Sequence, residues 1–205
     1  MSNESLTACR RGIGGGLVFV VAGPSGAGKN SVIDAVMERL SGLAFSVSYT
    51  SRAPRAGETD GEDYLFVSNE EFDRLVDEGE FLEHVTYSGN KYGTSRSQVL
   101  KAVAGGSDVI LQIEVRGAQL IRSSGIAGCR VVYIFFTPSS LDLLGARLRG
   151  RGSETEAQIA ARLAVAAEEI NEIDRFEYLV INDDFDAAVN ELAAIILAER
   201  SRITI

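Results

Sequence analysis

The 205-residue chain is poor in cysteine and in basic side chains, and it has no long apolar run. Its two cysteines, Cys9 and Cys129, give neither a disulfide framework nor a metal-binding spacing. The 20 Lys and Arg residues are outnumbered by 29 Asp and Glu residues, for a formal charge of -9. Because polyanions need a basic surface, this charge argues against nucleic acid or an anionic membrane as a partner.

No apolar stretch is long enough to cross a bilayer, and the first residues lack the apolar block of a secretory signal, so we expect a cytoplasmic protein. Residues 1–16 are polar and end in "GIGGG", which predicts a flexible leader. Hydrophobic residues make up 45% of the chain, enough for one globular unit with a sizeable core.

Apolar, β-branched runs of strand length recur along the chain: "LVFVVA", "DVILQIEV", "VVYIFF" and "YLVIN". Segments of helical periodicity separate them, which is typical of the α/β class, with a parallel sheet flanked by helices. Residues 45–96 break this rhythm and predict an inserted subdomain with short strands.

Helix starts and a core-facing stripe can also be predicted. Ser68 with Glu71, and Ser153 with Glu156, fit the capping box, in which two side chains satisfy free backbone N–H groups. In the last predicted helix, one face carries four apolar residues: Phe185, Val189, Leu192 and Ile196.

The stretch "GPSGAGK" follows a strand of buried type and opens a helix predicted from Lys29 to about Leu40. This context predicts a phosphate-binding loop, in which backbone N–H groups face phosphate oxygens and Lys29 reaches the β and γ phosphates. The predicted ATP-binding residues here are Gly23, Pro24, Ser25, Gly26, Ala27, Gly28, Lys29, Asn30 and Ser31.

Asn30 stands where the loop pattern has Ser or Thr, whose hydroxyl ligates Mg²⁺. The amide carbonyl of Asn30 is also a hard neutral oxygen, so ligation and the absence of ligation both stay open. Ser31 lies one helical step further on, about 100° around the axis, and cannot simply replace it.

In "SRAPR", a proline-stiffened turn holds Arg52 near Arg55, where the two can clamp a phosphate. A solvated surface pair is the alternative.

At this point the sequence closely resembles the guanylate kinases, which phosphorylate GMP with ATP. The matching stretches run in order from about Leu17 to Arg200: "GPSGAGK", "SVSYTSRAPRAGETDGEDYLFV", "GEFLEHVTYSGNKYGTS", "LRGRGSETEAQIAARL" and "VINDD". The resemblance implies a P-loop nucleoside monophosphate kinase fold, with a core of residues 17–44 and 97–205, a lid at about 140–153 and a GMP-binding subdomain at 45–96. It implies ATP and GMP as substrates, Mg²⁺ with ATP, and a monomer or homodimer.

The resemblance also assigns the GMP site. The expected phosphate-binding residues are Arg52, Arg55, Tyr64 and Tyr92, and the expected guanine-reading residues are Ser48, Glu83 and Thr94. Guanine offers adjacent N1–H and N2–H donors that one carboxylate accepts together, whereas adenine would turn an N1 lone pair toward Glu83.

The resemblance implies that Lys29, Arg147, Arg151 and Arg162 are catalytic and neutralise charge on the transferring group. Arg149 matches no such role and is expected to be solvated. Asn182 falls in the adenine-contacting region, although a turn asparagine after a strand is the competing interpretation.

Gln112, counted here with the GMP-binding residues, stands where guanylate kinases usually have an acidic residue, at a strand end beside the nucleotide cleft. Glu114, two residues on, could retain some acidic character. With Asn30, this predicts a less negative site and a high Mg²⁺ requirement. Two alternatives stay open: a catalytically weak scaffold that binds a phosphorylated partner, and a P-loop kinase acting on another acceptor.

Overall fold

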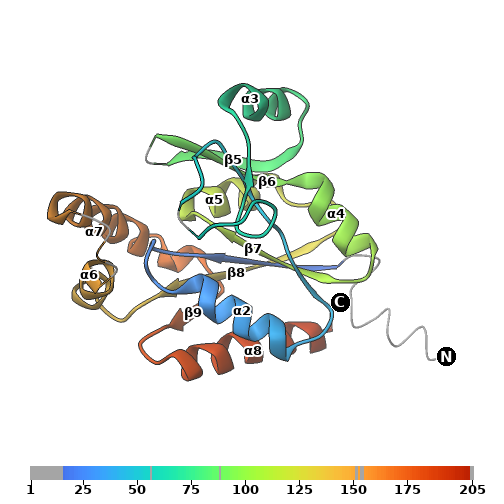
Figure 1. Cartoon of the computed structure of the whole chain (residues 1–205). Helices are drawn as coiled ribbons and strands as arrows, with labels where there is room; N and C mark the ends of the chain where they lie inside the picture. The colour runs from blue at the N-terminus through green and yellow to red at the C-terminus, as the bar shows by residue number, and fades with distance from the viewer. Residues whose placement is uncertain (1–15, 56, 88, 151, 153–154, 204–205) are drawn as a thin grey trace.

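The computed structural model describes residues 16–55, 57–87, 89–150, 152 and 155–203. Apart from Gly16, the predicted leader lies outside these residues, as does Arg151. Two sheets organise the described chain, a parallel core sheet and a smaller mixed sheet beside it (Figure 1).

The core sheet has five parallel strands in the order β2-β7-β1-β8-β9, which confirms the predicted α/β class. The strands are β1 (Leu17–Ala22), β2 (Leu43–Phe45), β7 (Asp108–Ile113), β8 (Arg130–Thr137) and β9 (Tyr178–Ile181). All six residues of β1 are buried, because helices cover both faces of the sheet.

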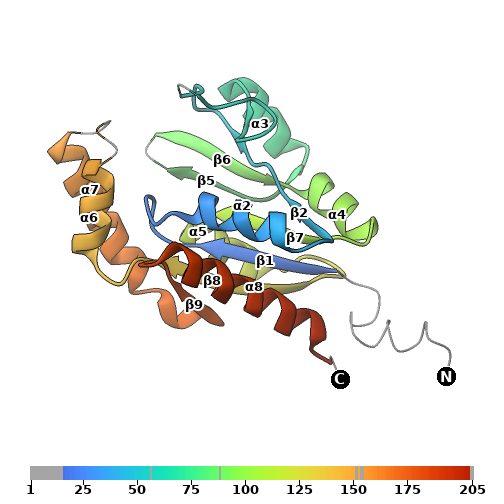
Figure 2. The same cartoon turned by 60° about the horizontal axis from the view of Figure 1, so that its bottom comes forward.

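Alternate residues of β1 point to opposite faces of the core sheet. Phe19 and Val21 pack with residues of α2 (Lys29–Arg39) and α8 (Phe185–Ser201), which lie together on one side (Figure 2). Val18 and Val20 pack with residues of α4 (Arg96–Ala104) and α5 (Val115–Ser124) on the other. The strand therefore reads as a continuous apolar run in the sequence.

The second sheet has the order β4-β3-β6-β5. Its elements are β3 (Tyr49–Thr50), β4 (Leu65–Phe66), β5 (Phe81–Tyr87) and β6 (Asn90–Ser95), with α3 (Asn69–Asp77) packed against β5. Strands β5 and β6 form an antiparallel pair. Leu82 of β5 is buried in the core cluster that contains Val115 and Ala118 of α5, so the two sheets share one apolar contact region.

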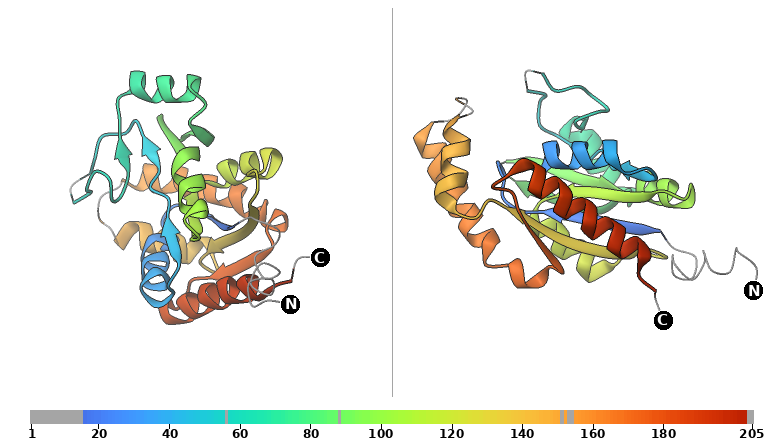
Figure 3. Two further views of the ribbon diagram at one scale, coloured as in Figure 1. Left: turned by 90° about the vertical axis from the view of Figure 1, so that its right-hand side faces the viewer. Right: turned by 90° about the horizontal axis from the view of Figure 1, so that it is seen from below.

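Helices α6 (Leu141–Gly150) and α7 (Glu156–Ile170) pack against each other at one end of the core sheet (Figure 3), and a 3-10 turn, η1 (Ile173–Arg175), leads from α7 toward β9. The arrangement places Arg147 and Arg162 beside the end of β1 from which the phosphate loop departs.

Two predicted helix starts have different outcomes. Ser68 is the N-cap of α3, and its hydroxyl accepts from the backbone N–H of Glu71. Ser153 lies outside the described residues; the helix predicted to start there has Thr155 as its N-cap, which forms a capping box with Gln158, so the predicted start is wrong. Two overlapping pairs fit the same motif two residues apart, and the helix uses the second.

The predicted stripe of the last helix is confirmed at Val189, Leu192 and Ile196, which are buried, whereas Phe185 is 46% exposed at the first turn of α8. Across the part of the chain that the structure describes, none of the helices has the length and apolar character of a membrane span.

Candidate active site

The loop between β1 and α2 has the conformation of a phosphate-binding loop. Gly23, Gly26 and Gly28 all have positive φ values, of 145°, 92° and 90°. A side chain on Gly23 would place its Cβ 2.0 Å from the Phe136 carbonyl oxygen, so glycine is required there. These glycines let the chain turn sharply into the N-terminus of α2, where N–H groups are left for an anion.

Lys29 is buried beneath the loop. Its Nζ donates to the carbonyl oxygens of Gly23 at 2.6 Å and Pro24 at 3.0 Å. The ammonium group is therefore held at the loop, in place for phosphate oxygens.

Three side chains from later in the sequence contact the same loop. The buried Asn182, just after β9, donates from Nδ2 to the Ala27 carbonyl oxygen at 2.7 Å, and Arg147 donates to that oxygen at 3.3 Å. Arg162 donates to Ser25 Oγ at 2.9 Å. Asn182 thus braces the loop, whereas Arg149 is exposed and pairs with Glu156.

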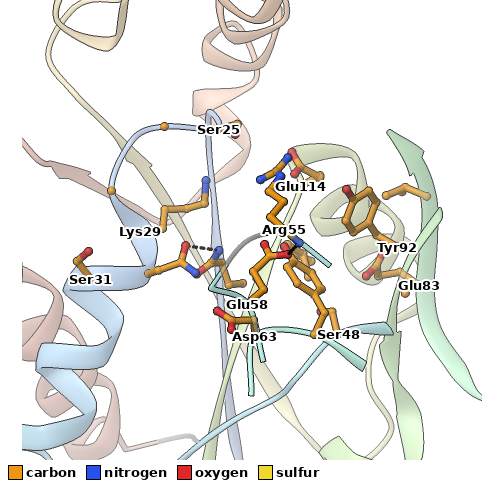
Figure 4. Close-up of a pocket in the computed structure, with 18 residues that line it drawn as sticks. Ser25, Lys29, Ser31, Ser48, Arg55, Glu58, Asp63, Glu83, Tyr92 and Glu114 are labelled. Carbon is orange, nitrogen blue, oxygen red and sulfur yellow. Dashed lines mark hydrogen bonds between the residues drawn. The ribbon is translucent and has the colours of Figure 1, made fainter. Parts of the chain in front are cut away.

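A cavity of about 330 Å³ runs from this loop to the second sheet. Figure 4 shows Ser25 and Lys29 on one wall and Tyr92 and Glu83 on the opposite wall, with Arg55 and Glu58 between them. The predicted site residues that line it are Ser25, Gly26, Gly28, Lys29, Asn30, Ser31, Ser48, Arg55, Tyr64, Glu83, Tyr92 and Gln112. Those outside its lining are Gly23, Pro24, Ala27, Arg52, Thr94, Arg147, Arg162 and Asn182.

Glu83 is a buried carboxylate at the far end of the cavity. Thr94 Oγ1 donates to its Oε1 at 2.6 Å, and its Oε2 has no hydrogen-bond partner among the described residues. Burial raises the pKa of Glu83 to about 7, although the Thr94 hydrogen bond acts in the opposite direction. A Cβ on Gly117 of α5 would lie 2.7 Å from Oε2, so glycine allows this helix to approach the carboxylate.

Tyr64 and Tyr92 form an edge-to-face pair with ring centroids 5.9 Å apart. Burial raises the pKa of Tyr64 to about 12, so its hydroxyl is a neutral donor at physiological pH. Together with Ser48, they add hydroxyl groups to the cavity between Glu83 and the turn at residues 52–55, called the arginine turn below.

The arginine turn is arranged around Glu58, which the sequence reasoning missed. Glu58 accepts two 2.8 Å hydrogen bonds from the Arg52 guanidinium and one of 2.7 Å from the backbone N–H of Arg55. The Arg52 hydrogen bond lowers the pKa of Glu58. Arg52 also lies over the rings of Tyr64 and Phe66. Arg55 rather than Arg52 therefore lines the cavity.

Glu114 and Asp63 also line the cavity and were not predicted as site residues. Glu114 follows β7 as the N-cap of α5, and its Oε2 has no hydrogen-bond partner among the described residues. Burial raises its pKa, while the charges of Lys29 and Arg162 lower it. A polar residue directly after a core strand is the sequence signal that marks this position.

The described side chains around Asn30 do not by themselves form a magnesium site. Asn30 Oδ1 accepts a 3.0 Å hydrogen bond from Gln112 Nε2. Within the described residues, no three His, Cys, Asp or Glu side chains are grouped to hold a metal ion. The donor set suits a magnesium ion that arrives on nucleotide phosphates.

Known proteins match the chain over nearly all of its length. The guanylate kinase family pattern covers residues 16–199. The chain belongs to the guanylate kinase family. It is 43% identical over 188 residues to a guanylate kinase of Caldanaerobacter subterraneus subsp. tengcongensis, covering 92% of this chain and 90% of that one. It is 44% identical over 191 residues to one of Salmonella paratyphi A, covering 92% and 91%.

The fold agrees with a solved guanylate kinase. The crystal structure of the enzyme from Anaplasma phagocytophilum superposes with a TM-score of 0.71 at 31% identity, over 92% of this chain and 88% of that one. Guanylate kinases are ATP:GMP phosphotransferases and use ATP with Mg²⁺. Family membership thus gives this chain its reaction and its two nucleotide substrates.

Proposed function

We propose that this chain transfers the γ-phosphoryl group of ATP, carried as its magnesium complex, to GMP, with the residue roles that follow. The observation that carries the proposal is one cavity with a phosphate loop on one wall and, on the other, a buried carboxylate with one oxygen that has no hydrogen-bond partner among the described residues. The cavity thus offers an anion site for the phosphates of ATP. At its other end, a carboxylate can accept hydrogen bonds from the N–H groups of guanine.

The triphosphate of ATP binds on the loop N–H groups and Lys29. Lys29 now contacts carbonyl oxygens of the loop, and it exchanges them for phosphate oxygens when the nucleotide enters. Arg147 and Arg162 lie at the same loop and neutralise charge that develops on the transferring group.

GMP binds with its base at Glu83 and its phosphate at Arg55, Tyr64 and Tyr92. Glu83 Oε2 accepts from guanine while Oε1 remains bonded to Thr94. Arg52 acts through Glu58, which holds the arginine turn in its observed shape. Transfer needs no covalent intermediate, because positioning and charge neutralisation supply most of the acceleration in phosphoryl transfer.

The proposal includes a cytoplasmic location, where both nucleotides are available. No observation favours the non-catalytic scaffold over the kinase.

A coupled assay of ADP release with GMP, with AMP and without an acceptor tests the proposal. We expect release with GMP alone. Equal rates with AMP would show that Glu83 does not select the base, and no release with any acceptor would contradict the kinase function.

A further inference from the structure

Asn30 and Gln112 are joined by a hydrogen bond at the floor of the cavity. Gln112 lies near the end of β7, where it pairs in register with Val21 of β1, and Asn30 is the second residue of α2. Gln112 Nε2 donates to Asn30 Oδ1 at 3.0 Å. The bond therefore links a core strand to the helix that follows the phosphate loop.

The direction of this bond decides which atoms of Asn30 remain for a ligand. Gln112 takes one of the two lone pairs of the Asn30 amide oxygen and fixes the amide plane, and the Nδ2 group is the part not used in the bond. Asn30 is exposed and lines the cavity. An amide N–H group binds phosphate oxygens, whereas Mg²⁺ requires an oxygen ligand.

The pair also carries no charge. A carboxylate at the position of Gln112 would attract Mg²⁺ and repel free nucleotide phosphates, and neutral amides do neither. Gln112 Oε1 is buried, with no hydrogen-bond partner among the described residues, so this side chain is held from one end only.

We infer that Asn30 and Gln112 form a neutral amide pair that binds ATP phosphate oxygens through Asn30 Nδ2 and leaves Mg²⁺ to the nucleotide and water. The inference rests on the proposed function, because it assigns the phosphate loop to ATP. Asn30 is thereby a phosphate-binding residue, and Gln112 is the positioning residue that orients its amide.

Calorimetric binding of ATP, with Mg²⁺ and with a chelator, tests the assignment without measuring activity. Asn30→Ala should raise the Kd for free ATP and for MgATP by the same factor, about tenfold for a hydrogen bond to a charged group. Asn190→Ala, which removes an exposed asparagine of α8, is the matched control. A loss confined to MgATP would show metal ligation by Asn30, and no loss in either would remove Asn30 from the phosphate site. Both results overturn the inference.

A second variant reverses the bond. Gln112→Glu keeps the shape but can only accept, so Asn30 must donate from Nδ2 and turn Oδ1 toward the ligand. The ratio of the Kd for free ATP to the Kd for MgATP should then rise about tenfold over wild type. Gln98→Glu on α4, away from the cavity, controls for the added charge. An unchanged ratio in a folded variant would overturn the role of Gln112.

These outcomes are separable from the kinase function. A chain that binds ATP but does not phosphorylate GMP would contradict the proposed function and still report on Asn30. If Gln112→Glu does not fold, Asn30→Ala decides the matter, because Asn30 is exposed and no core packing depends on it.

Discussion

Thr94 Oγ1 on β6 donates a 2.6 Å hydrogen bond to Glu83 Oε1 on the paired strand β5. The bond fixes one carboxylate oxygen, while the other, Oε2, is buried and has no hydrogen-bond partner among the described residues. A base with two adjacent donors can therefore be read by a carboxylate that is already oriented.

Replacing Glu83 by Gln should weaken GMP use. The change keeps the shape and removes the charge of the acceptor, at a cost of about 1.5 to 3 kcal/mol for a charged hydrogen bond. We expect kcat/KM for GMP to fall tenfold or more while the KM for ATP stays the same. Glu191→Gln, an exposed position on α8, is the control. An unaltered kcat/KM would place guanine elsewhere.

The same carboxylate should make stability depend on pH. Burial raises the pKa of Glu83 from 4.5 to about 7, so the folded state binds this proton more tightly than the unfolded state. Its contribution to stability is complete below pH 4.5 and is lost as pH rises to about 7. Glu83→Gln lacks this loss, so its Tm relative to wild type should rise between those pH values and then stay constant. A pH-independent difference would contradict the shift.

Gly117→Ala should impair the guanine end of the cavity. In a helix, Ala is normally favoured over Gly by about 0.5 to 1 kcal/mol, but here the new Cβ would lie 2.7 Å from Glu83 Oε2. We expect a raised KM for GMP and an unchanged KM for ATP. Gly150→Ala, where nothing lies within 4 Å, should leave both constants unchanged. Wild-type kinetics in Gly117→Ala would mean that α5 can move away without cost.

Asn182→Ala should loosen the phosphate loop. It removes the 2.7 Å hydrogen bond to the Ala27 carbonyl oxygen and should reduce the free energy of unfolding by about 1 to 3 kcal/mol. The KM for ATP should rise more than the KM for GMP. Asn190→Ala, which loses only an exposed contact with Arg39, should change neither. If the KM for ATP stays at its wild-type value, the bracing is structural only.

Variants of Arg55 and Arg162 should differ in the kinetic constant that they change. Arg55→Ala should raise the KM for GMP, because Arg55 lines the acceptor end, whereas Arg162→Ala should lower kcat, because it lies at Ser25 of the donor loop. Arg149→Ala, on an exposed ion pair of α6, is the control. A rise in the KM for GMP alone in both variants would show that this division is wrong.

The parts of the fold that follow from local rules could be predicted from the sequence. The β1 run and the glycines of the loop specify a buried strand and a turn that L side chains rarely make, and together they predict the strand, the loop and the helix that follows. The sequence does not specify the N-cap of α7, because two capping-box motifs overlap there. Thr155 is the N-cap in the folded helix.

The hydrogen-bond and packing partners of individual side chains could not be predicted in the same way. Arg52 bonds to Glu58 and lies over Tyr64, and Asn182 bonds to a carbonyl 155 residues away. Such pairings depend on the assembled tertiary structure, which a motif does not encode. The bond between Asn30 and Gln112 is of the same kind, since the two residues are 82 positions apart and their motifs place both near the nucleotide without pairing them.

The second sheet is connected to the core by two short stretches of chain, one after β2 and one where β6 enters α4. The phosphate loop and the five parallel strands are built without any of its residues. In the function that we propose, ATP is therefore bound mainly by the core and GMP mainly by the second sheet. A chimaera that exchanges residues 46–95 for the equivalent segment of another nucleotide kinase would inherit the ATP side intact. The contacts to be matched are those of Leu82 and Glu83 with α5, and those of α4 with residues 79–81.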